Sequence, residues 1–252
     1  MRPNIKSWMT LLMFTVSVNL NALTLEGIYP IEASENMDLS GLAMCQGKLL
    51  TVSDKNSTAI YQIENHSNVF TLTRFQEINM LGVHSQNFQF PNNIYYSIYR
   101  LLDNSNYDWE GISCIDQSIY LASERHVKIA EVTRMKSDIP KWHDINIKHI
   151  EESGLLAKYN AFVEGLTVDS DYFYLGIERE PRGMVKVDRK TGRVSSNRYH
   201  DNNHSKRPAD IAGLAMWRDE LFLLSRNEES ICQVDKVTMD VEKCYSYKEV
   251  VR

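Results

Sequence analysis

The stretch YDWEGISC, residues 107–114, places a carboxylate directly before a glycine in a run rich in apolar and aromatic residues. The stretch AFVEGLTV, residues 161–168, repeats this arrangement. Two looser copies are MDLSGLAM, residues 37–44, and ADIAGLAM, residues 209–216. All four share a glycine followed by an aliphatic residue and a small residue. The pattern predicts four equivalent strands of a repeated structural unit.

The four copies also agree thirteen residues after the glycine, where each has a charged residue. Three of them reach it through an apolar run and a serine, in LLTVSD, IYLASE and LFLLSR, and the fourth reads FYLGIE. This register needs no gaps, so the internal repeat extends well beyond the short motif. The four charged residues are Asp54, Glu124, Glu178 and Arg226.

Each copy reads as four short strands. Two runs rich in β-branched, aromatic and aliphatic residues are joined by a turn, then come a third alternating run and a more polar fourth. Such runs predict β-hairpins, and repeated four-stranded antiparallel units are typical of a β-propeller. A glycine suits the innermost strand because backbones crowd around the axis. We expect an all-β fold, a single β-propeller of four-stranded antiparallel blades, with five blades favoured over four or six.

The spacing between the glycines indicates where the repeat is interrupted. The intervals are 70, 54 and 48 residues, and the first is too long for one blade. We therefore predict an insertion or degenerate blade at residues 79–107, with a short helix near residues 95–102. A second short helix is expected at residues 151–160. The strand at residues 23–31 is expected to pair with the last blade and close the ring, which would hide sheet edges.

The first 22 residues have the form of a secretory signal peptide. Arg2 and Lys6 precede an 11-residue apolar run, and Ala22 offers a small residue for cleavage. A membrane anchor is the weaker alternative, because a span needs about 20 apolar residues. We expect residues 1–22 to be removed and residues 23–252 to form a secreted or periplasmic propeller with no membrane span.

The charge of the chain disfavours nucleic acid as a partner. Losing two positive charges with the signal peptide moves the formal net charge from −5 to −7. Nucleic-acid binding depends on lysines and arginines that neutralise phosphates, whereas an acidic chain suits cations.

The chain has four cysteines, and an even number in an exported protein permits disulfides. Cys232 and Cys244 flank the segment QVDKVTMDVEK. A hairpin centred on residues 237–239 would place the two opposite each other and allow a cross-strand disulfide. Two free buried thiols are the alternative.

Carboxylates recur at the start of the predicted inner strands. The residue before the glycine, at one mouth of the central channel, is Glu110 in one copy and Glu164 in another. Asp38, Asp108 and Asp210 recur two residues earlier. A ring of carboxylate oxygens is what Ca²⁺ binds, because it takes six to eight oxygens at about 2.3–2.6 Å. These five residues are therefore candidate calcium ligands, with turn-fixing and clamping of neighbouring blades as the alternative.

The charged residues that follow the second strand of each copy are candidate ligand-binding groups. Adjacent side chains of a strand point to opposite faces, so one member of each Glu-Arg pair can face the channel while the other pairs with a neighbouring blade. Inter-blade salt bridges are the alternative function for the Glu-Arg pairs. The set comprises Asp54, Glu124, Arg125, Glu178, Arg179 and Arg226.

Signatures of catalysis are absent from the sequence. It contains no G-x-S-x-G elbow, no H-E-x-x-H and no phosphate-binding glycine loop. His126 is the one histidine placed near the predicted channel, as a general base or, in the alternative, as an ordinary packed residue. Trp109 and Trp217 fit blade packing better than ligand stacking.

The segments LSGLAM, DWEGISC with IYLASERH, and VEGLTV with FYLGIERE resemble the SdiA-regulated family of exported β-propellers and its relatives with an esterase-like phytase domain. The resemblance covers residues 38–235 apart from the insertion. It implies a six-bladed propeller, calcium binding as in some members, and no defined activity. The chain departs from the family in having no clear fifth or sixth copy after Asp235.

Together these features predict an exported, non-catalytic β-propeller that binds Ca²⁺ and a small ligand or partner protein at the channel mouth. The alternative is a metal-assisted hydrolase of esters or phosphoesters, in which the ion polarises a substrate oxygen. The sequence offers no convincing nucleophile or base, which favours the first prediction.

Overall fold

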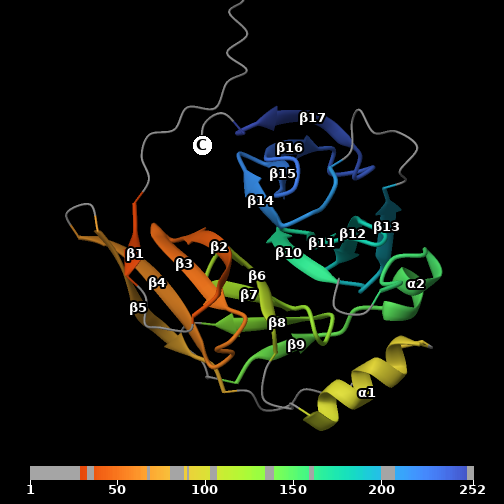
Figure 1. Cartoon of the computed structure of the whole chain (residues 1–252), viewed down its shortest axis with the longest axis horizontal. Coiled ribbons are helices and arrows are strands. Elements are labelled where there is room, and N and C mark those ends of the chain that lie inside the picture. The colour runs from red at the N-terminus through yellow and green to blue at the C-terminus, as the bar shows by residue number, and fades with distance from the viewer. Residues whose placement is uncertain are drawn as a thin grey trace, which may run out of the picture.

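Four antiparallel sheets are arranged around a common centre in the computed structural model (Figure 1). The structure describes residues 29–32, 37–66, 69–79, 88–89, 91–102, 107–133, 139–158, 162–199 and 208–248. The expected signal peptide, residues 1–22, and the first part of the expected N-terminal strand lie outside this part of the chain.

Each sheet corresponds to one copy of the repeat and is called a blade. Blade 1 contains β2 (Leu39–Cys45), β3 (Lys48–Ser53), β4 (Ala59–His66) and β5 (Val69–Glu77), with β1 (Ile31–Glu32) at its outer edge. Blade 2 contains β6 (Trp109–Ile115), β7 (Ser118–Ser123), β8 (Lys128–Thr133) and β9 (Lys141–His143). Blade 3 contains β10 (Val163–Val168), β11 (Tyr172–Ile177), β12 (Gly183–Asp188) and β13 (Val194–Arg198). Blade 4 contains β14 (Gly213–Trp217), β15 (Glu220–Ser225), β16 (Ser230–Val234) and β17 (Val241–Ser246).

The fold is therefore an all-β propeller, and the described residues form four blades where five were favoured. In the described part of the segment 79–107 the secondary structure is helix α1 (Asn92–Leu102), which lies beside blade 2 and α2 at the periphery (Figure 1). No helix among the described residues is long and apolar enough to cross a membrane.

Helix α2 (Ile147–Glu152) begins and ends earlier than the sequence indicated. The Asn146 side chain caps it by accepting a hydrogen bond from the His149 N–H (3.3 Å). Gly154 follows with a φ of +82°, a left-handed conformation that suits glycine and ends the helix. The expected helix over residues 153–158 is therefore wrong, and residues 159–160 lie outside the described residues.

The thirteen-residue spacing between the glycine and the charged residue reflects a backbone hydrogen bond within the blade. In blade 2 the N–H of Glu124 donates to the carbonyl of Asp108 (2.9 Å), and in blade 3 the N–H of Glu178 donates to that of Phe162 (2.9 Å). Each bond closes the end of the hairpin made by the two innermost strands. The Asp54 N–H donates to the Asp38 carbonyl (3.2 Å) in the same way, so the charged residue and the start of the motif are held together at one end of blades 1, 2 and 3.

The repeated glycines mark the points where inner strands approach one another. A Cβ on any of the first three would meet the backbone of the next blade, which only glycine avoids. The closest backbone nitrogens are those of Ile112 for Gly41 (3.0 Å), Leu166 for Gly111 (2.8 Å) and Leu214 for Gly165 (2.9 Å).

Among the described strands, the ring of blades is open between blade 4 and blade 1 (Figure 1). The Cβ position of Gly213, the fourth glycine, meets only Leu224 of its own blade (3.8 Å). Apolar side chains on both flanking blades are correspondingly exposed, among them Leu42 (58%), Met44 (65%) and Trp217 (57%). In a closed ring these faces would lie between blades.

The described end of the predicted N-terminal strand, residues 29–31, does not pair with the last blade as expected, and residues 23–28 lie outside the described residues. Strand β1 pairs in parallel with β5 of blade 1, with Ile31 opposite Phe70. The Tyr29 ring also packs edge-on against Phe70, with 5.4 Å between ring centroids. Strand β5 is nine residues long, and its outer edge supplies the partner that the last blade was expected to provide.

Three hydrophobic cores fill the spaces between successive blades. Val52 and Trp109 belong to the core between blades 1 and 2. Ile129 and Phe173 belong to the core between blades 2 and 3, and Leu223 to the core between blades 3 and 4. The blades are thus held as one body around the inner strands.

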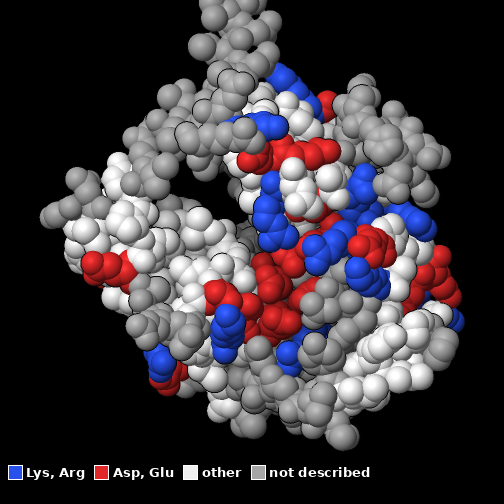
Figure 2. Space-filling model, in the orientation of Figure 1, with Lys and Arg blue, Asp and Glu red and all other residues white. Residues whose placement is uncertain are grey.

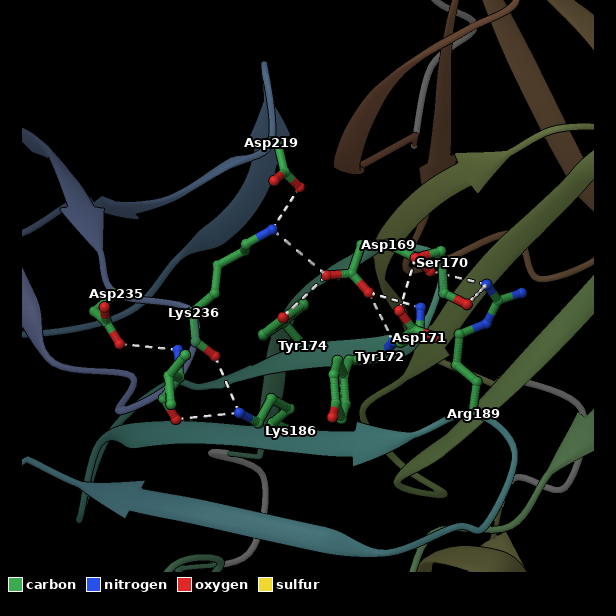
Figure 3. A network of polar contacts seen from close by, with 11 residues as sticks. Asp169, Ser170, Asp171, Tyr172, Tyr174, Lys186, Arg189, Asp219, Asp235 and Lys236 are labelled. Carbon is green, nitrogen blue, oxygen red and sulfur yellow. Dashed lines mark hydrogen bonds and ion pairs between the residues drawn. The ribbon is translucent and has the colours of Figure 1, made fainter.

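A polar network also fastens blade 3 to blade 4 on the side of the β10–β11 turn (Figure 3). The Tyr174 hydroxyl donates to Asp169 (3.0 Å), and the Lys236 ammonium lies 3.9 Å from the same carboxylate. Lys236 also pairs with Asp219 of blade 4, and the Lys186 ammonium donates to the Lys236 carbonyl (3.1 Å). Burial, and next the Asp169 charge, raise the pKa of Tyr174.

Two disulfides are present. Cys232 and Cys244 face each other on β16 and β17 and are bonded. The second disulfide, Cys45–Cys114, was not predicted and joins the ends of the innermost strands of blades 1 and 2. A signal for it existed, because the two cysteines lie four and three residues after their blade glycines, at nearly equivalent positions of adjacent inner strands.

Candidate functional site

A cavity of about 390 Å³ lies between the innermost strands of all four blades. Its walls are mostly aliphatic. Among the described residues that line it, four have polar side chains, and none is a lysine or arginine. The polar four are Ser40, Thr51, Glu110 and Glu164.

Glu110 connects this cavity to a cluster of carboxylates. One oxygen each of Asp54, Asp108 and Glu110 lie within 4.8 Å of one another, and all three residues are half-buried. Asp54 and Asp108 do not line the cavity, so Glu110 lies at the junction between cavity and cluster. Figure 2 shows aspartates and glutamates gathered at the centre of this face, with lysines and arginines beside them.

Asp54 has an oxygen that nothing in the described structure satisfies. Its Oδ1 is buried and has no hydrogen-bond partner. Asp54 occupies the repeat position of Glu124, whose longer side chain accepts a hydrogen bond from the Phe162 N–H of the next blade (2.9 Å). A buried oxygen without a partner is costly, and a bound cation is one way to satisfy it. The contact between blades 1 and 2 thus differs from that between blades 2 and 3, because Asp54 lacks the hydrogen bond to the next blade that Glu124 makes.

Burial raises the pKa of several of these carboxyl groups. For Glu110 the pKa is raised to about 9, first by burial and then by the charges of Glu164, Asp108 and Glu124. Burial likewise raises the pKa of Glu124 to about 8 and that of Glu164 to about 7. A cation placed among these groups would favour their charged forms.

Glu124 and Glu178 hold neighbouring blades together. Glu124 accepts from the backbone of Phe162, the residue before β10. Glu178 of blade 3 accepts a hydrogen bond from Arg226 of blade 4 (3.2 Å), and Arg179 lies 2.8 Å from the same carboxylate. Of these contacts, the Glu178–Arg226 pair is an inter-blade salt bridge of the kind considered as the alternative, whereas Arg179 belongs to the same blade as Glu178.

The structure does not bring Asp38 and Asp210 into the carboxylate cluster. Asp38 is exposed and forms an ion pair with Lys55. Asp210 is fully buried within blade 4, where its Oδ1 accepts from the Ser225 hydroxyl (2.7 Å) and the Asn227 N–H (3.0 Å). Its Oδ2 lies 3.7 Å from Arg226. Asp210 therefore fixes a turn in its own blade.

His126 is packed in the protein interior. Its Nδ1 is hydrogen-bonded to the Tyr96 hydroxyl of α1 (2.9 Å), and its ring lies 5.0 Å from that of Tyr107. Trp109 is fully buried, whereas Trp217 is exposed on the open face of blade 4, with the Arg218 guanidinium 4.3 Å from its ring centre. Packing of Trp217 between blades was therefore wrongly expected, because no blade covers that face in the described chain.

Sequence reasoning placed some residues in one set and the structure places them in another. Asp54 was assigned to ligand binding, but it lies with the candidate calcium ligands Asp108 and Glu110. Arg125 is half-buried in the turn after β7 and does not line the cavity. The apolar cavity wall was not foreseen, because identifying it requires knowing that the ring is open.

The sequence matches no family model and no curated protein. Among solved structures it is similar to the glutaminyl cyclase of Myxococcus xanthus, with a TM-score of 0.53 and 12% identity over 86% of this chain and 74% of that one. It is also similar to AztD of Citrobacter koseri, with a TM-score of 0.39 and 12% identity over 82% and 46% of the two chains. Kuenenia stuttgartiensis hydrazine synthase is also similar, with a TM-score of 0.45 and 11% identity over 85% of this chain and 52% of that one. The likeness to the glutaminyl cyclase supports the β-propeller fold and nothing further.

Proposed function

We propose that this protein is an exported β-propeller that binds Ca²⁺ in its central channel and does so without catalysing a reaction. The ion would be held by Asp54, Asp108 and Glu110. The observation that supports this most strongly is the convergence of three carboxylates from two blades within 4.8 Å, one of them with a buried oxygen that has no hydrogen-bond partner.

The chemistry of this donor set suits a hard divalent cation. Ca²⁺ prefers carboxylate oxygens and tolerates irregular geometry, so three carboxylates with water or ligand oxygens form a reasonable set. Glu164 and Glu124 add negative charge nearby, since both interact electrostatically with Glu110. A bound ion would offset the mutual repulsion of these groups and would stabilise the fold by mass action.

Export and the family resemblance belong to the same proposal. Two disulfides in the described chain suit an oxidising compartment such as the periplasm or the cell exterior. The repeated S-G-L and E-G-I/L motifs support a place among the SdiA-regulated and phytase-related propellers.

One observation favours the hydrolase alternative. The pKa of Glu164 is raised to about 7, close to the value that suits a general base at neutral pH. In that alternative, Asp54, Asp108 and Glu110 would hold a Ca²⁺ ion, which would supply a Lewis acid for an ester or phosphoester oxygen, and Glu164 would accept a proton from the attacking water.

Thermal unfolding in the presence of Ca²⁺ or a chelator tests the proposal. We expect Ca²⁺ to raise the melting temperature of the wild type and to leave that of Asp54→Asn/Glu110→Gln unchanged. Glu242→Gln is the matched control, because Glu242 is exposed on β17 of blade 4 and lies outside the cluster, and it should respond like the wild type. A wild type indifferent to Ca²⁺ would refute the metal site. Ca²⁺-dependent turnover of ester or phosphoester substrates that is lost in Glu164→Gln would favour the hydrolase.

A further inference from the structure

The central cavity continues from the carboxylate cluster between apolar walls contributed by every blade. The wall residues include Leu42, Ile112, Leu166, Leu214, Phe222 and Leu224. Leu42 and Leu224 are exposed and belong to the blades that flank the opening of the ring. Its volume, about 390 Å³, falls within the range of small-molecule sites. Exposed apolar side chains grouped around a cavity of this size favour a ligand that covers them.

The polar groups of the cavity define the polar end of that ligand. The Thr51 hydroxyl is already used, since it donates to the Gly41 carbonyl (2.9 Å), and the Ser40 side chain is hydrogen-bonded to Glu110. Glu110 and Glu164 remain as the groups that can recognise a ligand. No lysine or arginine is among the described lining residues, so a bound carboxylate or phosphate would have no cationic partner in the cavity wall.

We propose that the cavity binds an amphiphilic organic cation. Its ammonium or guanidinium group is recognised by Glu110 and Glu164, and its hydrocarbon part lies along the aliphatic wall. The charged end forms charge-assisted hydrogen bonds to the carboxylates, and the apolar part removes Leu42 and Leu224 from water. The inference rests on the proposed function only in sharing Glu110.

The determinants of the two ligands are separable. Asp54 and Asp108 belong to the calcium cluster and do not line the cavity, whereas Ala215 and Leu224 line the cavity and lie outside the cluster. Because both cations use Glu110, binding of one weakens binding of the other, and the effect is reciprocal. Ca²⁺ is therefore an antagonist of the organic cation at this site.

Isothermal titration of the mature protein with n-octylammonium chloride tests the inference, in calcium-free buffer and below micelle-forming concentrations. Octanoate and 1-octanol are the matched probes with a negative and a neutral end. We expect octylammonium to bind about tenfold more tightly than either. Glu164→Gln should weaken octylammonium about tenfold and leave 1-octanol unchanged.

Two wall variants show whether the cavity itself is the site. Ala215→Trp, at an exposed position of β14, fills the cavity with a ring, and Leu224→Gln makes its wall polar. Both should weaken octylammonium about tenfold and keep the calcium response, with folding checked by circular dichroism. Asp54→Asn should leave octylammonium binding unchanged and abolish the calcium response.

Octanoate that binds as tightly as octylammonium, or octylammonium binding that is unchanged in both wall variants, would overturn the inference. Failure of the wild type to bind Ca²⁺ while octylammonium still binds would refute the proposed function and leave this inference standing. If the wild type binds Ca²⁺ but not octylammonium, this inference is refuted and the calcium proposal stands.

Discussion

Glu110 lies on β6 where the apolar cavity meets the carboxylate cluster, and its surroundings resist ionisation. Burial is the largest cause of its raised pKa, followed by the charges of Glu164, Asp108 and Glu124. Without a cation this carboxyl group is held largely neutral at pH 7, because its pKa is raised to about 9. The residue is therefore ready to change its charge when a cation arrives.

The raised pKa of Glu110 predicts how stability depends on pH. A carboxyl whose folded pKa lies above its ordinary value of 4.5 stabilises the fold in its neutral form, and this contribution is lost as pH rises toward about 9. In chelator, Glu110→Gln should match the wild type near pH 5 and exceed it in unfolding free energy near pH 9. Urea unfolding at both pH values measures this.

The same titration gives calcium binding a matching pH dependence. Ca²⁺ displaces the proton of Glu110, so the wild type should bind the ion more tightly as pH rises from about 6 to 9. A difference in stability between the wild type and Glu110→Gln that stays constant across this range would show that Glu110 does not titrate as its environment implies.

At the scale of elements, the strands are joined by contacts that repeat from blade to blade but are not identical. Glu124 joins blade 2 to blade 3 through a backbone N–H, and Glu178 joins blade 3 to blade 4 through Arg226. The corresponding residue of blade 1 is Asp54, with its unpaired Oδ1. The repeated contacts hold the blades together, and the candidate site lies where blade 1 departs from them, at Asp54.

Asp169 at the β10–β11 turn supports a prediction about how blade 3 meets blade 4 (Figure 3). It accepts from the N–H groups of Asp171 (2.9 Å) and Tyr172 (2.7 Å) and from the Tyr174 hydroxyl (3.0 Å). Asp169→Ala should lower the unfolding free energy by about 2–4 kcal/mol, as expected for several lost hydrogen bonds to a charged group. Asp219 is an exposed carboxylate that, like Asp169, pairs with Lys236. Asp219→Ala should have no measurable effect on the unfolding free energy. Equal losses would contradict this account of the network.

The two disulfides should contribute unequally. Cys45–Cys114 spans 69 residues and Cys232–Cys244 spans 12. In the chain-entropy description, the longer loop restricts the unfolded chain more, by about 1.5 kcal/mol. Replacing both cysteines of each pair by alanine and comparing denaturant midpoints tests this. A larger loss from the shorter loop would show that effects on the folded state dominate.

At the scale of the whole molecule, the four-bladed ring leaves a wedge between blade 4 and blade 1 (Figure 1). Around the rest of the ring, each glycine of an inner strand touches the backbone of the next blade, and only Gly213 does not among the described glycines of the motif. In the described part of the chain, the apolar wall of the central cavity is exposed at Leu42 and Leu224, on the two blades that flank this gap.

The hairpins could be predicted because their determinants are local. The spacing from Gly111 to Glu124 reflects a hydrogen bond between strands that are adjacent in sequence. The edge that the N-terminal strand joins could not be predicted, because the partner is distant in sequence; in the structure β1 joins β5, where Tyr29 packs against Phe70. The carboxylates could be listed from the sequence. The sequence could not show which of these carboxylates lie close together. Asp54 is one methylene shorter than Glu124, yet it lies in the carboxylate cluster whereas Glu124 accepts a hydrogen bond from the next blade.

A direct calorimetric titration of chelator-treated mature protein with CaCl₂ at pH 8 tests the central claim, which is that the channel carboxylates form a calcium site. We predict saturable binding of about one ion per chain for the wild type and for Glu242→Gln, and loss of that binding in Asp54→Asn and in Asp108→Asn. Absence of binding to the wild type, or binding that is equal in all four proteins, would contradict the claim.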